Sequence, residues 1–228
     1  VYRMPNRYRG KYKTQMVIRM PYGGGINALE HHSESMESIF GHIPGLKVIV
    51  PSTPHDAKGM LISAIEGDDP ILFMEPKRIY RAIKQEVSED KYTIPLGKAN
   101  VLSQGTDVTV VAYGAMVREV QKAMVLAKEA GISVELIDLR SIYPIDKETI
   151  TKSVKKTGRL ITVTEGPRTY GVGSEIGQIA LEEAFLHLEA PPARVSGFDV
   201  IVPLPKGEYH YMQDSYKIFY QIEKTVKY

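Results

Sequence analysis

Short apolar runs separated by amphipathic segments are the feature that most constrains the fold of this chain. Runs such as KVIV (47–50) and ILFM (71–74) have the length and composition of strands buried on both faces of a sheet. Between them, apolar residues recur at helical spacing over residues 56–66. Alternation of this kind predicts an α/β fold with a parallel sheet and helices packed on both of its faces.

The same pattern divides the chain into two halves. In the first half we expect strands at 14–20, 47–50 and 71–74 and helices at 33–41 and 52–66. In the second half we expect strands at 107–112, 133–139, 159–164 and 193–196 and helices at 116–130, 146–156, 174–188 and 215–226. We therefore predict a linker at 75–96 and two domains, residues 1–95 and 96–228, of which only the second has enough elements to be complete.

Composition excludes several classes of protein. The 228 residues carry a net charge of +2, which gives no global reason to bind nucleic acid or an anionic membrane. The chain has no cysteine, so disulfide scaffolds, cysteine-ligated metals and thiol nucleophiles are excluded. No apolar run approaches the roughly 20 residues of a membrane span, and no signal peptide is visible. We expect a cytoplasmic protein.

A glycine-rich turn followed by paired histidines is the most unusual local motif. The turn PYGGG (21–25) lets backbone approach a bulky ligand closely, and His32 can transfer protons near neutral pH. The alternative is a glycine turn before two helix-start histidines that bind nothing. Zinc is disfavoured because neither H-E-x-x-H nor another recognised ligand spacing is present. Ser33 lacks the G-x-S-x-G context of a nucleophile.

A second glycine pattern, GVGSEIG (171–177), lies between an expected strand and an expected helix. This is the position of a dinucleotide-binding fingerprint, but the spacing differs from G-x-G-x-x-G and no acidic partner is evident. We favour a glycine-rich helix start with Ser174 as the N-cap.

The first 29 residues hold six basic residues, several tyrosines and no acid. Interleaved basic and aromatic residues can bind phosphates or single strands. Because the remainder of the chain is acidic overall, a solvated or subunit-facing segment is the interpretation we prefer.

The turn IEGDDP (65–70) closes the helix expected at 52–66 with backbone carbonyls and carboxylates. Oxygen atoms of this kind can hold a hard cation, although such a turn is more often a helix stop before proline.

Read together, these motifs resemble one known family. PYGGGI, HHSES, FGHIPGLKVIVPSTPHDAKGMLISAIEGDDPILFMEPK, IPLGKANVL, GTDVTVVAYG, VELIDLRSIYPID, TGRLITVTEGP, GVGSEI and LEAPPARVSGFD occur in order over nearly the whole chain. They resemble the β subunit of the thiamine-diphosphate-dependent decarboxylating component of 2-oxoacid dehydrogenase complexes, of the pyruvate and branched-chain types.

The resemblance implies a fold, a reaction and partners. Residues 1–95 would be the carboxyl-terminal part of a pyrimidine-binding domain, and residues 96–228 a complete transketolase-type carboxyl-terminal domain. An α2β2 heterotetramer would hold thiamine diphosphate and magnesium between subunits, decarboxylate a 2-oxoacid and pass the acyl group to a lipoyl group of the acyltransferase core. The segment FMEPKRIYR (73–81) resembles the branched-chain enzymes more than the pyruvate enzymes and so favours a branched-chain substrate.

The resemblance also assigns site residues. The family's proton-handling histidine falls on His32, whereas His31 has no histidine counterpart and no catalytic role is expected for it. A potassium site would use backbone groups of Ala64, Ile65 and Gly67 together with Asp69. The family's glutamate and aromatic contacts to thiamine lie upstream of every residue present, so we name no cofactor-binding residue and expect a chain that begins partway through the first domain.

Two other functions are compatible with the sequence. The chain can be a structural assembly module without catalysis of its own. It can also belong to a related thiamine enzyme such as a transketolase or a deoxyxylulose-phosphate synthase, although these usually carry all domains on one chain.

Overall fold

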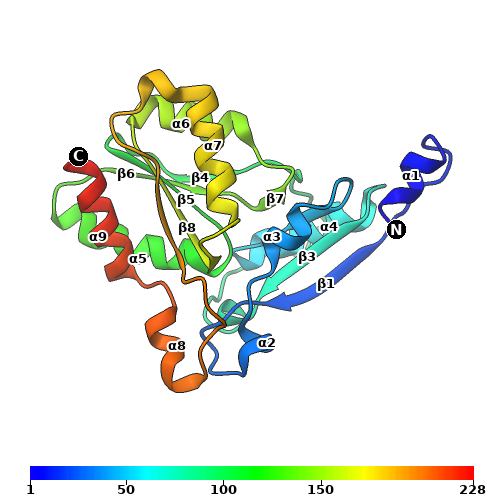
Figure 1. The fold of residues 1–228 in the computed structure, drawn as a ribbon. Helices are drawn as coiled ribbons and strands as arrows, with labels where there is room; N and C mark the ends of the chain where they lie inside the picture. Colours follow the sequence, from blue (N-terminus) through cyan, green and yellow to red (C-terminus); the bar gives the residue numbers. More distant parts are fainter.

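The computed structural model describes residues 1–228 as two β-sheets with helices packed around them (Figure 1). The strands are β1 (Val17–Tyr22), β2 (Lys47–Ile49), β3 (Ile71–Pro76), β4 (Asn100–Ser103), β5 (Val108–Ala112), β6 (Val134–Asp138), β7 (Ser141–Tyr143), β8 (Leu160–Pro167) and β9 (Ala193–Gly197). The helices are α1 (Arg3–Arg7), α2 (Glu30–Ser33), α3 (Glu37–Gly41), α4 (Pro54–Glu66), α5 (Ala115–Glu129), α6 (Lys147–Thr157), α7 (Val172–Ala184), α8 (Pro205–Tyr211) and α9 (Ser215–Val226), with short 3₁₀ turns η1 (Lys77–Ile79) and η2 (Phe185–His187). None of them combines the length with the apolar composition that a membrane crossing requires.

The first sheet has the strand order β1-β3-β2-β7. Strands β1, β3 and β2 run parallel, with Val48 opposite Leu72. Helix α4 provides the crossover that parallel neighbours need. It begins where it does because the Thr53 side chain accepts a hydrogen bond from the backbone N–H of Asp56 and Pro54 occupies the first turn.

The fourth strand of this sheet comes from the second half of the chain. Strand β7 pairs antiparallel with β2, placing Tyr143 opposite Val48. The backbone N–H of Val50 donates to the carbonyl of Arg140 at 2.8 Å, which continues the contact past the end of β2. The second half therefore completes the sheet of the first.

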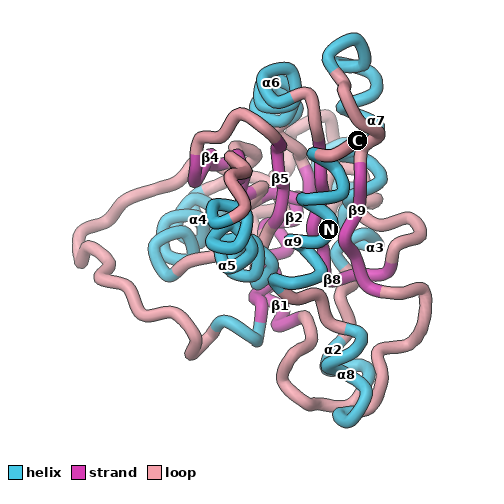
Figure 2. The backbone as a smooth tube through the Cα atoms, turned by 90° about the vertical axis from the view of Figure 1, so that its left-hand side faces the viewer, coloured by secondary structure: helices cyan, strands magenta, loops and turns pink.

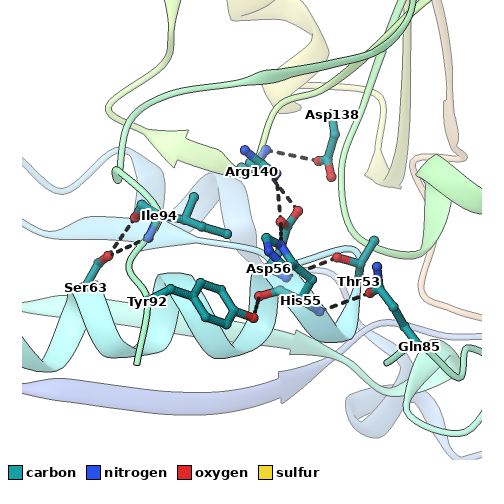
Figure 3. A network of polar contacts seen from close by, with 9 residues as sticks. All are labelled: Thr53, His55, Asp56, Ser63, Gln85, Tyr92, Ile94, Asp138 and Arg140. Carbon is teal, nitrogen blue, oxygen red and sulfur yellow. Dashed lines mark hydrogen bonds and ion pairs between the residues drawn. The ribbon is translucent and has the colours of Figure 1, made fainter. Parts of the chain in front are cut away.

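A buried ion pair fastens the same junction (Figure 3). Arg140 donates from Nη2 to Asp56 Oδ1 at 2.7 Å and from Nε to Asp56 Oδ2 at 2.9 Å. The side chains are only 14% and 4% exposed. The backbone N–H of Arg140 also donates to Asp138 Oδ1 at 3.2 Å. Bidentate geometry of this kind fixes the relative orientation of the two groups.

The second sheet has the strand order β4-β6-β5-β8-β9, with β4 antiparallel to β6 and the other strands parallel. Helices α5 and α9 lie on one face, and α6 and α7 on the other (Figures 1 and 2). On β5, Val110 packs in the cluster with α5 and α9, whereas Val111 packs in the cluster with α6 and α7. Burial on both faces explains why the strand is apolar throughout.

One hydrophobic cluster crosses from the first sheet to the second. It contains Val48 and Leu72 from the first sheet together with Val111, Ile137 and Ile176 from the second half. Satellite clusters complete the packing under α4 and beside α8. The two halves thus share apolar packing as well as a sheet.

Most expected strands and helices are confirmed, and the departures are local. The helix expected at 33–41 is shorter, because only α3 (Glu37–Gly41) lies within it and Ser33 is the last residue of α2. The helices are separate because Glu34 is extended and its carbonyl accepts a hydrogen bond from Gly23 N–H at 3.0 Å. The prediction of Ser174 as an N-cap is wrong. Helix α7 begins at Val172 with Gly171 as its N-cap, and Ser174 lies inside the first turn. Strands β4 and β7 and helices α1 and α8 were not predicted.

The segment 75–96, which was expected to be a linker, starts with the last two residues of β3 and continues through η1. It then runs without regular structure toward β4. Lys58 on α4 fastens it by donating to the carbonyls of Glu89 at 3.2 Å and Asp90 at 3.0 Å. The division into domains at residues 95 and 96 stays a prediction.

Candidate active site

The glycine-rich turn at 23–25 follows β1 and is enclosed by side chains from other segments. Gly23 and Gly25 have φ angles of +86° and +80°, which favour glycine. A Cβ on Gly23 would lie 2.8 Å from Glu165 Oε2, and one on Gly25 would lie 2.7 Å from Arg78 Cδ. The glycines are therefore required by backbone conformation and by close approach.

Helix α8 holds the exit of this turn. Glu208 is buried, and its Oε1 and Oε2 accept hydrogen bonds from the backbone N–H groups of Gly25 and Asn27, each at 2.7 Å. Figures 1 and 2 both place α8 beside α2, the helix into which the turn leads. The second half of the chain thus shapes a loop of the first half.

His32 lies on α2 with an exposed imidazole. Its ring is 4.1 Å from that of His31 in a perpendicular arrangement. Its backbone is fixed at both ends: the N–H donates to the carbonyl of Leu29 at 2.9 Å, and Lys77 Nζ donates to the His32 carbonyl. A fixed backbone with a free imidazole is suited to proton transfer with a group that reaches it from outside the chain.

Two acids are buried behind the glycine turn. Glu37 Oε1 accepts a hydrogen bond from Tyr113 Oη at 2.7 Å, but its Oε2 has no partner. Glu165 Oε1 is likewise buried without a partner. Burial raises the pKa of Glu165 to about 8, and the charge of Glu37 adds to this shift. Burial also raises the pKa of Glu37. Glu165 is therefore mainly a neutral acid at pH 7.

The residues predicted to hold a cation gather at the end of α4. Ala64 is buried in the last turns, Ile65 is exposed, and Gly67 is the C-cap, extended and without a backbone capping bond. Asp69 follows in the next turn, where its Oδ2 lies 2.8 Å from Lys47 Nζ. The structure brings these residues together, and the Asp69 charge already has a partner.

The other motifs are accounted for by packing. A Cβ on Gly173 would overlap the Thr162 hydroxyl, so the GVG pattern lets α7 approach β8 closely. Ser174 accepts from Arg194 at 2.5 Å. In the basic amino-terminal segment α1 buries no residue, and Tyr8 packs edge-on against Tyr12 at 5.0 Å.

A separate cavity of about 360 Å³ lies between α4, β3 and η1. Its wall includes Glu75, which accepts from Tyr80 Oη at 2.7 Å and pairs with Arg19. No sequence motif predicts this cavity. Its lining includes neither His32 nor the predicted cation ligands.

Sequence reasoning also missed the acids around the turn, Glu37, Glu165 and Glu208. Glu165 offered one signal, because it is a carboxyl at the end of the apolar run LITVT in a strand expected to be buried. Buried carboxyls are rare without a partner or a role. Glu208 gave no comparable signal, because its partners are backbone groups about 180 residues away in the chain.

Comparison with known families agrees with this arrangement. Residues 3–83 match the family described as "Transketolase, pyrimidine binding domain", and residues 97–218 match "Transketolase, C-terminal domain". A solved structure, "Split gene transketolase, inactive beta4 tetramer", superposes with a TM-score of 0.77 at 24% identity, covering 94% of this chain and 67% of that one. This likeness shows the fold.

Curated relatives are more similar in sequence. The pyruvate dehydrogenase E1 component subunit beta of Acholeplasma laidlawii is 57% identical over 225 residues, which are 99% of this chain and 69% of the relative. The corresponding subunit of Mycoplasma pneumoniae is 46% identical with the same coverage. The mitochondrial 2-oxoisovalerate dehydrogenase subunit beta of Dictyostelium discoideum is 48% identical, over 97% of this chain and 61% of the relative. These matches confirm the resemblance found in the sequence.

The buried acid predicts a pH dependence of stability. The pKa of Glu165 is raised from 4.5 to about 8 by folding. Its stabilising contribution is therefore complete below about pH 4.5 and is lost as the pH rises through about 8. Between about pH 5 and 8 we expect the free energy of unfolding, measured by urea denaturation, to fall more steeply in the wild type than in Glu165→Gln, by up to about 1.4 kcal/mol per pH unit, and above that range we expect the two slopes to converge.

The exposed Glu175 on α7 provides the control. Glu175→Gln should keep the wild-type slope. Burial also raises the pKa of Asp138 to about 7. Asp138 therefore adds its own fall of the unfolding free energy with pH, and this fall should be the same in the wild type and in both variants. Identical slopes in the wild type and in Glu165→Gln would contradict the assignment of a neutral Glu165.

Proposed function

We propose that this chain, which belongs to the β subunits of the E1 component of 2-oxoacid dehydrogenases, acts with an α subunit in decarboxylating a 2-oxoacid and passing the acyl group to a lipoyl group. The observation that carries the proposal is the exposed imidazole of His32 beside a glycine turn that side chains of other segments enclose. The family relationship supports the reaction class.

The surroundings of His32 support an interface with another subunit. Ile26, Leu29 and Ile39 are apolar side chains that are 38%, 57% and 60% exposed on the same stretch of chain. Exposed apolar patches of this kind mark contacts with partners. We propose an α subunit as the partner here, in an α2β2 assembly, with the dihydrolipoyl acyltransferase core as a second partner of the assembled enzyme.

Thiamine diphosphate, with magnesium, is the cofactor we propose for the assembled enzyme. When bound, it supplies the nucleophilic carbon that decarboxylation of a 2-oxoacid requires. At the exposed end of the turn, Gly25 presents only backbone to a ligand that approaches from solvent, while Arg78 fills the space where a Cβ would lie. Within this chain, His32 would donate and accept protons at its imidazole nitrogen, and Lys77 would fix its backbone.

The substrate is either pyruvate or a branched-chain 2-oxoacid. The segment FMEPKRIYR favoured the branched-chain class, whereas the relatives at 57%, 46% and 44% identity are named as pyruvate enzymes. We propose pyruvate, and the 48% identical 2-oxoisovalerate relative supports the second candidate. Turnover of the two acids by the assembled enzyme distinguishes them. For location we propose the cytoplasm.

The direct test replaces His32 in the protein assembled with an α subunit. We expect His32→Ala to lower the rate of transfer to lipoyl groups by about 10²–10⁴-fold, the usual contribution of a general acid or base. The control is His31→Ala, which removes the adjacent exposed imidazole and should leave the rate within about twofold. Wild-type transfer in His32→Ala would overturn the role of His32. A structural assembly module would show no thiamine diphosphate binding with or without the α subunit.

We further propose a monovalent-cation site formed by Ala64, Ile65, Gly67 and Asp69. The donor chemistry fits at the helix end, because the last carbonyls of a helix carry partial negative charge and the C-cap Gly67 makes no capping bond. At Asp69 the cation would replace Lys47 Nζ, which lies 2.8 Å from Oδ2. Potassium should then stabilise the protein relative to choline at equal ionic strength, by ~2.7 kcal/mol when present at about 100 times its dissociation constant.

Thermal unfolding in potassium chloride and in choline chloride measures this difference. We expect Asp69→Ala to reduce it, whereas Asp68→Ala, which removes a neighbouring carboxylate paired with Lys13 and Gln15, should preserve it. Equal stability of the wild type in both salts would exclude the site.

A further inference from the structure

The segment from the glycine turn to His32 has an unusual anchor. Gly25 and Asn27 both have positive φ angles, +80° and +55°. In this conformation their N–H groups converge on the single carboxylate of Glu208, one on each oxygen, at 2.7 Å. Backbone N–H groups of a turn that converge in this way form a concave binding site for an anion. Here the anion is a side chain of the same protein.

The anchor lies between otherwise exposed parts of the segment. Gly25 and Asn27 are exposed, but Glu208 is only 2% exposed. A carboxylate that is removed from water needs its hydrogen bonds, and bonds to a charged acceptor are stronger than those between neutral groups. The two hydrogen bonds therefore hold residues 25–27, which are exposed to solvent.

Helix α8 is held in place by α9, the next helix of the second half. Lys217 on α9 donates to the carbonyls of His210 at 2.9 Å and Met212 at 2.6 Å, at the end of α8. Gln213 donates to the carbonyl of the buried Tyr211 at 2.9 Å. The position of Glu208 is thus set by α9, which packs on the second sheet through Ile218 and Ile222.

We propose that Glu208 is a positioning residue that orients the His32 segment. This inference rests on the proposed function of His32 and extends it to a residue of the other half of the chain. Through Glu208, the second sheet and its helices set where the turn ends and α2 begins, and so where the imidazole of His32 is presented. The second half would then contribute to the chemistry without touching the reacting atoms.

Glu208→Gln tests the anchor, because an amide keeps one acceptor and replaces the other with a donor that faces an N–H group. Glu183→Gln is the matched control, because Glu183 is an exposed helical glutamate of the same half. In Glu208→Gln we expect hydrogen exchange of residues 23–34 to accelerate by roughly 10- to 100-fold, the range for losing a hydrogen bond to a charged acceptor. Exchange in β5 and β8 should be unchanged, and Glu183→Gln should match the wild type throughout.

The second readout is specific to positioning. The imidazole resonance of His32 should shift in Glu208→Gln, but that of His187 in η2 should not. In the enzyme assembled with an α subunit, kcat should fall at least tenfold while KM changes less than threefold. Unchanged exchange and unchanged kcat in Glu208→Gln, alongside an inactive His32→Ala, would overturn the proposal. Faster exchange together with full activity of His32→Ala would support the anchor and refute the function proposed for His32.

Discussion

The contact between β2 and β7, fastened by the Asp56–Arg140 ion pair, is the constraint on which the rest of the structure depends. It places a strand of the second half at the edge of the first sheet. A buried pair of this kind gains little net free energy, because desolvation offsets the attraction, but leaving one member unpaired is strongly destabilising. The pair therefore selects one arrangement of the halves, and the apolar cluster that spans both sheets supplies the stabilisation.

The site follows from that arrangement. Once the halves are docked, Glu165 at the end of β8 meets Gly23, and Glu208 on α8 meets Gly25 and Asn27. Each contact joins residues more than 100 positions apart. The glycine turn is thus a contact between the two halves, and it is also the segment that precedes His32 in the chain. Glycine is needed there as much for the side chains of the second half as for any ligand.

Local patterns in the sequence predicted the central strands and long helices, because burial on both faces imposes apolar runs on strands and a 3.6-residue period on helices. The same signal was weak for β7, since three residues of an edge strand carry no periodicity. His32 was found through its glycine context and the family motif. Glu208 was missed because its partners are backbone groups about 180 residues away, which no local pattern records. Glu165 carried a local signal, a carboxyl at the end of a buried apolar run, but its neighbours Gly23 and Glu37 are brought to it only by tertiary packing.

The most direct test of the account is whether the two halves unfold together. Native-state hydrogen exchange at increasing urea concentration reports the free energy of opening for β2 and β3 in the first sheet and for β5 and β8 in the second. If the halves unfold together, the slowest amides of both sheets converge on one global unfolding free energy. Exchange of β2 and β3 through a separate opening of lower free energy, with β5 and β8 still protected, would contradict it.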